Sequence, residues 1–476
     1  MSTIRTDQLD IITREKWLFG SFAALIIAMV FASIVLDNPL PLALPIVLLY
    51  IYFAVQHPKA LFYLFFMLLP FSIEYEIGSL GTDLPSEPMM LSLMGIAFLL
   101  IITRVKQISH NIWLHPISLI MIVHICWIAI TAISSTHPII SWKYFLAKLW
   151  YVIPFYFLPL ILLKKTTDYL KIFTLMLPCL LIAIFYVLAK HAGSGFSFAT
   201  SNTVVRPIFR NHVDYAIMLV IFLPYLFFLL KNSKGTKFWV HVLYLLIFLI
   251  AIYFSYTRAA QVSIILAVAF YFILRFRLLK IAIGTTMILA AALTMYLSVN
   301  NNYLDYAPDF ERAVTHKKFD NLIEATTKMQ DVSTVERFYR WIAGFYMVAE
   351  KPVAGFGPST FFSNYRPYTV TSYKTYVSDN PEKSGIHNNY LMVAVEQGIP
   401  GLIIMLLMTV IPLLYAEQIY FNIDDIIDKG LLVAAATCHF LISMTLFMND
   451  ILEADKIGPL YFLSTSIIVF LSIKKR

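Results

Sequence analysis

The chain has 476 residues, of which 59% are hydrophobic and 13% are charged, and its formal net charge is +8. An average soluble domain carries about 25% charged residues, so this composition excludes an ordinary soluble fold. The basic residues lie in short clusters between apolar segments, which indicates membrane topology and not nucleic-acid binding. Cys126, Cys179 and Cys438 fall in apolar segments without CxxC spacing, so neither a disulfide framework nor a zinc site is indicated.

Apolar segments recur along the chain at about 16 to 22 residues, the length that crosses a bilayer core as a helix. We predict an all-α polytopic membrane protein with about fourteen transmembrane helices. The number falls to twelve if the short segment at 60–73 and the pair around Arg258 are divided differently. The predicted spans are 17–36, 39–55, 60–73, 88–104, 113–134, 145–163, 169–190, 213–230, 236–256, 259–274, 278–298, 390–416, 429–449 and 457–473.

Lysine and arginine favour the cytoplasmic loops of membrane proteins. Placing both termini in the cytoplasm assigns the basic clusters at 104–106, 164–165, 231–237 and 275–280 to that side. The first outer loop, 74–87, then contains acidic residues and no lysine or arginine. The exceptions on the outer side are Lys143, Arg206, Arg210, Arg258 and Lys456. The arginines among them become candidate functional residues, because the topology rule does not predict positive charge on the outer side.

The only long hydrophilic segment is 299–386, which contains acidic and basic side chains together. We predict that it forms a folded extracytoplasmic cap between a transmembrane bundle at 1–298 and further transmembrane helices at 387–476. These three regions are the predicted domains.

An amphipathic helix is predicted within this cap. Ser333 and Glu336 fit a capping box, and Pro352 and Gly355 end the helix. The apolar residues at helical spacing are Phe338, Trp341, Ile342, Phe345 and Val348. Such a helix would lie across the membrane-facing mouth of the protein or over the bundle.

At the end of the cap, His387 and Asn388 are followed after nine residues by Gly398 and Gly401. His387 would lie just outside the start of a helix, whose positive dipole end favours anions. The glycines would let that helix bend or pack closely. The alternative is that His387 and Asn388 only cap a transmembrane helix, which asparagine does well.

Three outer arginines are candidates for binding an anion. Arg258 lies between two long apolar segments, where an anion-binding role is the default hypothesis for an intramembrane charge and snorkelling to the interface is the alternative. Arg206 and Arg210 are four residues apart and could clamp a diphosphate bidentately. The alternative for this pair is an anchor for lipid headgroups.

Other catalytic signatures are absent from the sequence. It contains no P-loop, so consumption of ATP is not expected. It also contains no HExxH motif and no GxSxG elbow, which argues against a zinc protease and a serine hydrolase.

Taken together, these segments resemble the O-antigen ligases and Wzy-type O-antigen polymerases. The resemblance covers roughly residues 200–415. Its motifs are Arg337 to Trp341, the run 352–361, and an H-[NSQ]-x9-G-x-x-G pattern met by His387, Asn388, Gly398 and Gly401. The segment at Arg258 resembles an R-x-x-x-L motif of the family, with Val262 in place of leucine.

The resemblance implies a GT-C type glycosyltransferase of the bacterial inner membrane. Its donor would be a glycan on undecaprenyl diphosphate, its acceptor the lipid A core or another glycan, and its active site would face the periplasm. No nucleotide, metal or other cofactor would be needed. His387 and Arg258 would be catalytic, and the substrate-binding residues would be Arg206, Arg210, Asn388, Arg337 and Arg340.

Two other classes of protein stay open from the sequence. A flippase or transporter of lipid-linked oligosaccharides also has many spans and buried arginines, but such transporters usually have broken helices in matching halves and short loops. A structural or sensory membrane protein gives no reason for the His387 motif. Within the family, the sequence does not separate a ligase from a polymerase.

Overall fold

The computed structural model describes residues 2–77, 80–306, 332–375, 378–380 and 383–474. The chain divides into two units, Met1–Phe62 and Tyr63–Arg476, which are described separately. The first unit contains α1 (Ser2–Val35), η1 (Leu40–Leu42), α2 (Ala43–Gln56) and the beginning of α3 (Pro58–Leu68). Apolar side chains of α1 and α2 are widely exposed, as expected where lipid is the solvent.

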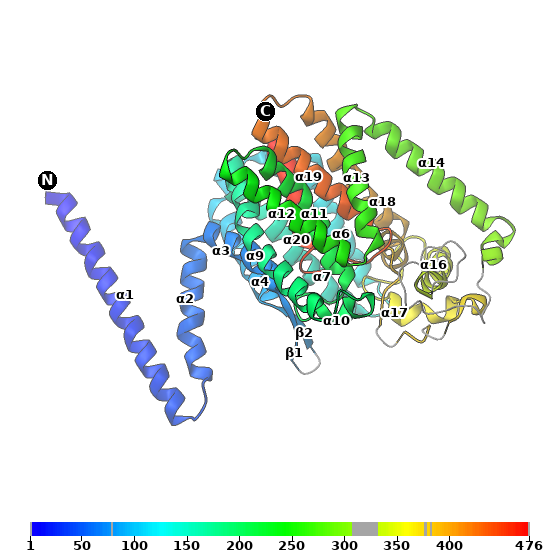
Figure 1. The fold of residues 1–476 in the computed structure, drawn as a ribbon. Helices are drawn as coiled ribbons and strands as arrows, with labels where there is room; N and C mark the ends of the chain where they lie inside the picture. Colours follow the sequence, from blue (N-terminus) through cyan, green and yellow to red (C-terminus); the bar gives the residue numbers. More distant parts are fainter. Residues whose placement is uncertain (1, 78–79, 307–331, 376–377, 381–382, 475–476) are drawn as a thin grey trace. The chain divides into compact units, whose positions relative to one another are not determined.

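The second unit is a helical bundle (Figure 1). The α-helices of the bundle are α4 (Ser86–Arg104), α5 (His110–Trp113), α6 (Pro116–Ile133), α7 (Pro138–Val152), α8 (Leu158–Leu162), α9 (Thr166–Gly193), α10 (Ser201–Val204), α11 (His212–Lys231), α12 (Thr236–Phe254), α13 (Arg258–Arg275), α14 (Leu279–Ser298), α16 (Val332–Glu350), α17 (Phe361–Asn364), α18 (Asn389–Tyr420), α19 (Ile426–Thr445) and α20 (Gly458–Lys474). A π-helical turn, η4 (Ile153–Phe157), joins α7 to α8. Short 3-10 turns lie at η2 (Leu69–Phe71), η3 (Val105–Gln107), η5 (Phe198–Thr200), η6 (Val299–Tyr306), η8 (Arg366–Tyr368) and η9 (Thr371–Tyr373).

Every predicted apolar segment coincides with a helix, but the number of spans is smaller than predicted. Within the described residues, 10 helices are long and apolar enough to cross a membrane, or 11 with one bent pair. The bent pair joins Leu40–Gln56 to Pro58–Phe71 at 113°, so the two segments predicted at 39–55 and 60–73 make one span at most. Phe19–Val35 and Gly458–Lys474 are shorter apolar helices.

A β-hairpin occupies part of the first outer loop, where no strand was predicted. Strands β1 (Ile73–Ile77) and β2 (Leu80–Leu84) pair antiparallel, with Glu74 opposite Asp83. Two like charges directly opposite each other destabilise a hairpin. A cation from another loop compensates for them, as described below.

The bundle is held together by apolar packing and by hydroxyl contacts. In α11 and α19, more than half of the residues in the most apolar part of the helix are buried. In α14, almost none of them are buried. Tyr225 of α11 lies 2.8 Å from Ser464 of α20, measured between hydroxyl oxygens, and Thr465 lies 3.0 Å from Nδ1 of His439 in α19. Such contacts are typical of helices that pack in a lipid environment.

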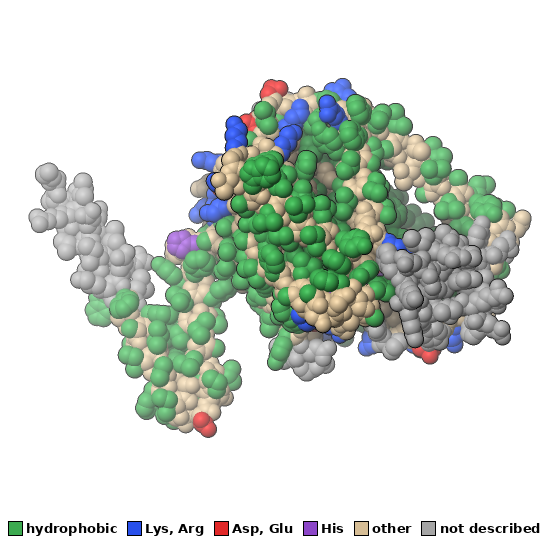
Figure 2. Space-filling view, in the orientation of Figure 1, with side chains coloured by type: hydrophobic (Ala, Val, Ile, Leu, Met, Phe, Trp, Pro, Cys, Tyr) green, Lys and Arg blue, Asp and Glu red, His purple; other side chains and the backbone are tan. Residues whose placement is uncertain are grey.

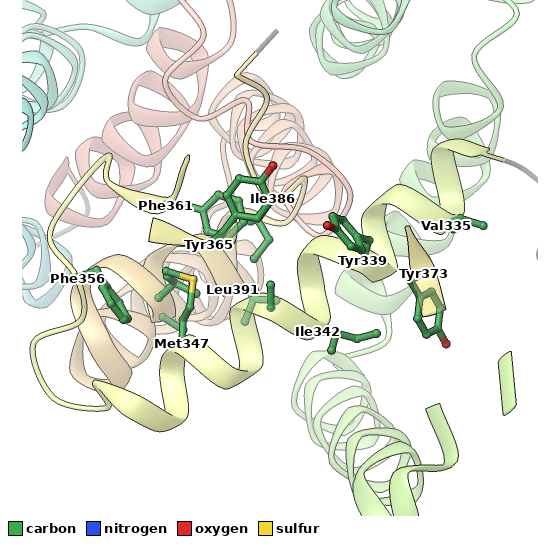
Figure 3. Close-up of a cluster of buried hydrophobic side chains, with 13 residues drawn as sticks. Val335, Tyr339, Ile342, Met347, Phe356, Phe361, Tyr365, Tyr373, Ile386 and Leu391 are labelled. Atoms are coloured by element: carbon green, nitrogen blue, oxygen red, sulfur yellow. The ribbon is translucent and has the colours of Figure 1, made fainter. Parts of the chain in front are cut away.

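The cap has its own apolar cluster, which joins it to the start of α18 (Figure 3). One side of α16 contributes Val335, Tyr339, Ile342 and Met347. These side chains face residues from the loop 356–373, together with Ile386 and Leu391. The predicted amphipathic helix is confirmed, and it ends at Glu350, just before Pro352.

The predicted capping box at the start of α16 involves the side chain of Ser333. The helix already includes Val332, and the side chain of Ser333 lies outside the described residues. The carboxylate of Glu336 accepts hydrogen bonds from the hydroxyls of Thr375 and Ser378. Glu336 therefore ties α16 to the loop that leads to His387.

The two ends of the second unit differ in charge. The hairpin end contains the hairpin, residues 193–212, the α12–α13 turn, the cap and residues 446–457. At the opposite end, where α20 finishes, many lysine and arginine side chains gather (Figure 2). This end contains the loops that carry Arg104, Lys164, Lys231 and Arg277, and the positive-inside rule therefore favours it as the cytoplasmic one.

Candidate functional site

The His387 motif forms a short helix and a membrane-spanning helix that fold back on each other. Gly398 lies inside α18 with φ of 72° and ψ of −176°, which is not helical. Tyr390 and Thr409 are 19 residues apart, yet their hydroxyl oxygens are 3.1 Å apart. In an unbroken helix they would be separated by about 28 Å along the axis. Segment 389–397 is therefore a separate helix that turns sharply at Gly398 into the span 399–420, which confirms the predicted bend.

Backbone groups freed by this turn are satisfied by the run 352–361. Ile399 donates to the carbonyl of Pro352 at 2.7 Å, and Phe356 and Gly357 donate to the carbonyls of Val395 and Glu396 at 3.0 and 2.9 Å. The indole of Trp127 donates to the carbonyl of Gln397 at 2.9 Å. Broken helices persist in membranes only where neighbouring groups replace the lost bonds. The two sequence motifs are thus one structural unit.

The two motif glycines are required by close contacts. A Cβ on Gly398 would lie 2.1 Å from the carbonyl oxygen of Val353, and one on Gly401 would lie 2.5 Å from the Cβ of Gln397. The backbone angles of Gly398 also belong to a region that only glycine populates freely. Gly398 allows the turn, and Gly401 allows the two helices to touch.

Replacing Gly398 by alanine is therefore expected to destabilise the protein. The strained backbone costs about 1–3 kcal/mol, and the clash with the 352–361 run adds to it. Thermal unfolding in detergent should show a Tm several degrees lower. Gly284→Ala is the matched control, because a Cβ there meets nothing within 4 Å. Equal Tm values for the two variants would contradict the role given to Gly398.

The backbone around His387 is held by three separate contacts. Arg340 donates to the carbonyl of Gly385 at 2.9 Å, and the Trp341 indole donates to that of Ile386 at 3.1 Å. The amide of His387 donates to Oδ2 of Asp450 at 2.7 Å. His387 has φ of 57°, a conformation that costs a residue with a side chain energy and tends to occur at functional sites. The surrounding contacts fix this histidine in place.

The electrostatic surroundings keep His387 neutral. Burial and, to a smaller extent, the charges of Arg340 and Arg337 lower its pKa to about 4. Taking up a proton would place an imidazolium beside two guanidinium groups. At neutral pH the ring can therefore accept or donate a hydrogen bond, but it is a weak base.

Asp450 is a stronger candidate for proton transfer. Burial and the charge of Glu453 raise the pKa of Asp450, the hydrogen bond from the His387 amide lowers it, and the net pKa is about 7. Its Oδ1 atom is buried and makes no hydrogen bond within the described chain. A carboxyl group that titrates near neutral pH suits acid–base chemistry. Asp450 was missed by the sequence analysis, since a single aspartate after an apolar segment carries no motif.

Glu453, in the same loop, is tied to α7. Its carboxylate pairs with Lys148 and accepts a hydrogen bond from Tyr144 at 2.8 Å. Burial alone raises the pKa of Glu453, but attraction and a hydrogen bond from Lys148 outweigh it, so the pKa is lowered overall. The 446–457 loop is thereby fixed on the bundle, with Asp450 directed to His387.

The candidate substrate-binding residues near His387 differ in their existing contacts. Arg340 is buried and bonds to the carbonyl of Gly385 and to Glu336, so it positions the loop. Arg337 lies close enough to His387 to affect its titration and is partly exposed. The side-chain oxygen of Asn388 accepts from the amide of Leu391 at 3.0 Å. Asn388 thus caps the 389–397 helix, as the alternative interpretation stated.

Arg210 is engaged by the hairpin. Its guanidinium lies 3.1 Å from Glu74 and 2.9 Å from Asp83, the facing carboxylates of the two strands. Burial and the charge of Asp455 raise the pKa of Asp83, the charge of Arg210 lowers it, and the net pKa is about 6. Arg206 is exposed, and its Nε donates to the carbonyl of Arg210 at 3.4 Å. Among the described residues, Arg210 therefore forms ion pairs with the hairpin, and no such ion pair is seen for Arg206.

Arg258 is the first residue of α13, after a tight turn from α12. Tyr256 has φ of 54° in this turn, and its hydroxyl donates to the carbonyl of Phe196 at 2.6 Å. Thr257 donates to the carbonyl of His212 at 3.3 Å. A cation at the positive end of a helix dipole is unfavourable for the helix. The position instead combines two features that attract an anion: the charge of the guanidinium group and the positive end of the α13 dipole.

The predicted residues form two groups at the hairpin end. The first group consists of His387, Arg337 and Arg340. The second group consists of the Arg206–Arg210 loop and the turn before Arg258. The 446–457 loop contacts both groups. Asp450 accepts a hydrogen bond from the amide of His387, and the Lys456 ammonium lies 5.3 Å from the ring centroid of Phe209 in the Arg206–Arg210 loop.

Comparison with known proteins gives a family match for part of the chain. Residues 242–406 match the family model described as O-antigen ligase. This range includes Arg258, both cap arginines and the complete His387 motif. No curated protein matches the chain. The protein is thus a multi-pass membrane protein in which residues 242–406 match the O-antigen ligase family model.

Proposed function

We propose that this protein transfers a glycan from undecaprenyl diphosphate to an acceptor hydroxyl on the periplasmic face of the bacterial inner membrane, as an O-antigen ligase. The observation that carries the proposal is the arrangement at His387. A neutral imidazole, a carboxyl group that titrates near pH 7 and a partly exposed arginine meet where a broken helix begins. The family domain supports lipid-linked glycans as the substrate class.

In the proposed reaction, the acceptor oxygen forms a bond to the anomeric carbon of the donor glycan. The bond between that carbon and the diphosphate oxygen breaks, and its electron pair leaves with the lipid diphosphate. The acceptor proton passes to the carboxylate of Asp450. Arginines stabilise the charge that grows on the leaving diphosphate, and Arg258, Arg206 and Arg337 are the proposed donors to it.

His387 orients the acceptor hydroxyl in this scheme. Its lowered pKa makes it a poor proton acceptor at neutral pH, whereas its neutral ring can hold a hydroxyl by a hydrogen bond. The pKa of Asp450 is better matched to removal of the proton.

The pH dependence of transfer tests the role of Asp450. The base must be deprotonated, so kcat should rise as pH increases through about 7 and level off above it. Asp450→Asn should lower kcat by roughly 10²- to 10⁴-fold and remove this rise. Asp424→Asn is the control, since Asp424 lies between α18 and α19 at the opposite end. An unchanged pH profile in Asp450→Asn would exclude it as the proton acceptor.

Orientation in the membrane gives a further prediction. Reporter fusions at residues 320 and 476 should report opposite compartments, with residue 320 in the periplasm. The arrangement of basic loops at the α20 end supports this orientation. Equal compartments at both positions would remove the proposed periplasmic location of the site.

A Wzy-type polymerase is the second candidate, because the matched family includes both activities. Gel analysis of surface polysaccharide from a deletion strain separates them. Loss of all attached glycan is expected for a ligase, whereas attachment of one repeat without chain growth indicates a polymerase. Accumulation of lipid-linked glycan on the cytoplasmic side of the membrane would favour a flippase and contradict both.

A further inference from the structure

Lys456 is a buried cation on the predicted outer side of the protein, where the topology rule does not predict positive charge. We propose that Lys456 is a positioning residue: it offsets the charge of the carboxylates beside the Arg206–Arg210 loop and so holds that loop in place. Its hold on the loop does not depend on the proposed reaction. Only the consequence for the donor rests on the proposed function.

The side chain of Lys456 joins three segments of the chain. Its ammonium donates to the carbonyl of Ser72, directly before the hairpin, at 2.6 Å. The ammonium also lies 3.8 Å from the carboxylate of Asp455 and 5.3 Å from the ring centroid of Phe209. A cation at this distance is attracted to the face of an aromatic ring. Lys456 thus connects the 446–457 loop with the base of the hairpin and with the Arg206–Arg210 loop.

The neighbouring carboxylate is buried as well. Asp455 is 8% exposed, and its Oδ2 atom accepts a hydrogen bond from the hydroxyl of Ser86 at 3.0 Å. The Ser86 hydroxyl lies 2.6 Å from that of Ser72. Removing one partner of a buried ion pair leaves the other charge uncompensated, which is strongly unfavourable. Lys456 supplies the counter-charge for Asp455 at the base of the hairpin.

Carboxylates outnumber cations around this position. Within the described residues, Lys456 and Arg210 lie in a cluster with five carboxylates, those of Glu74, Asp83, Glu87, Asp214 and Asp455. With every group ionised, the cluster has an excess of three negative charges (5 − 2). Loss of Lys456 would raise the excess by one and leave Arg210 to face all the carboxylates. Like charges repel one another, so we expect the hairpin and the Arg206–Arg210 loop to separate.

The orientation of Arg206 depends on the part of the loop that Lys456 contacts. The Nε atom of Arg206 donates to the carbonyl of Arg210 at 3.4 Å, and the Arg210 side chain pairs with the hairpin. The carbonyl of Arg206 accepts from the ammonium of Lys190 in α9 at 2.7 Å, which fixes the other end of the loop. Movement of Phe209 and Arg210 would therefore release the Arg206 side chain from its present orientation.

Hydrogen–deuterium exchange of the full chain in detergent tests the hold on the loop. Lys456→Met removes the charge, and Lys143→Met is the matched control, because Lys143 is an exposed lysine of α7 on the same predicted outer side. We expect faster exchange in peptides covering residues 205–211 for Lys456→Met and no change for Lys143→Met. A double variant with Asp455→Asn and Lys456→Met removes one charge of each sign, so its exchange should return to the wild-type rate.

Two results would overturn the proposal. The first is wild-type exchange at residues 205–211 in Lys456→Met. The second is a double variant that exchanges as fast as Lys456→Met, because packing and not charge would then hold the loop. If Lys456→Met does not fold, the double variant decides. A folded double variant with wild-type exchange supports the offset of charge, and failure to fold or fast exchange contradicts it.

Transfer assays with purified lipid-linked donor test the consequence for Arg206, which is a proposed ligand of the diphosphate. We expect kcat/KM for the donor to fall roughly tenfold or more in Lys456→Met, the scale of one hydrogen bond to a charged group, and to recover in the double variant. Unchanged kcat/KM in spite of faster exchange would overturn the link to Arg206. Absence of transfer by the wild-type protein would contradict the proposed function, while the exchange result would still decide the role of Lys456.

Discussion

Replacing Arg258 by alanine is expected to abolish glycan transfer while leaving the protein folded and inserted. Loss of one group that stabilises developing negative charge costs roughly 10²- to 10³-fold in kcat, and Arg258 combines its charge with the positive end of α13. Transfer should be measured with purified lipid-linked donor in detergent or vesicles. Arg275→Ala, at the other end of the same helix, is the matched control and should stay active.

The variant Arg258→Lys sharpens this test. Lysine restores the charge but not the planar fork that binds a diphosphate bidentately, so we expect it to rescue little activity. Full rescue by lysine would reduce the role to charge alone. Wild-type activity in Arg258→Ala would show that this arginine serves only as an interface anchor.

Replacing His387 by alanine is expected to lower turnover by roughly 10²-fold or more, with donor binding little changed. The backbone that carries the imidazole is held at the Ile386 carbonyl and at the His387 amide, and the ring faces the acceptor in the proposed scheme. Removing it leaves the hydroxyl without an oriented partner, an effect of the size usual for losing acid–base assistance. His241→Ala, near the start of α12 at the opposite end, is the control.

His387→Gln distinguishes orientation from proton transfer. Glutamine forms hydrogen bonds but does not take up a proton at neutral pH, so substantial activity is expected if His387 only orients the hydroxyl. Activity as low as that of His387→Ala would favour a general base in spite of the lowered pKa. Weaker donor binding in His387→Ala, in parallel with lower turnover, would move His387 to the diphosphate site.

The apolar segments of the sequence were enough to place the helices. A helix in a membrane must form its backbone hydrogen bonds internally and present apolar side chains to lipid. The number of spans was overestimated because two adjoining apolar segments bend by 113° at one junction. The hairpin at Ile73–Leu84 was missed because its strands are short and carry acidic residues. The division into 1–298, 299–386 and 387–476 stays a prediction.

Local sequence patterns were enough to predict the helical membrane fold, the position of the cap helix and the family resemblance, and to select His387, Arg258 and Arg337 as candidates. These features depend on composition and on motifs within short stretches of chain. The reversal of the chain at Gly398, the pairing of Arg210 with the hairpin and the contact of Asp450 with His387 became visible in the folded protein alone. Asp450 is 63 positions after His387 along the chain (450 − 387). Contacts of this kind depend on how separate helices pack, and no local pattern specifies them.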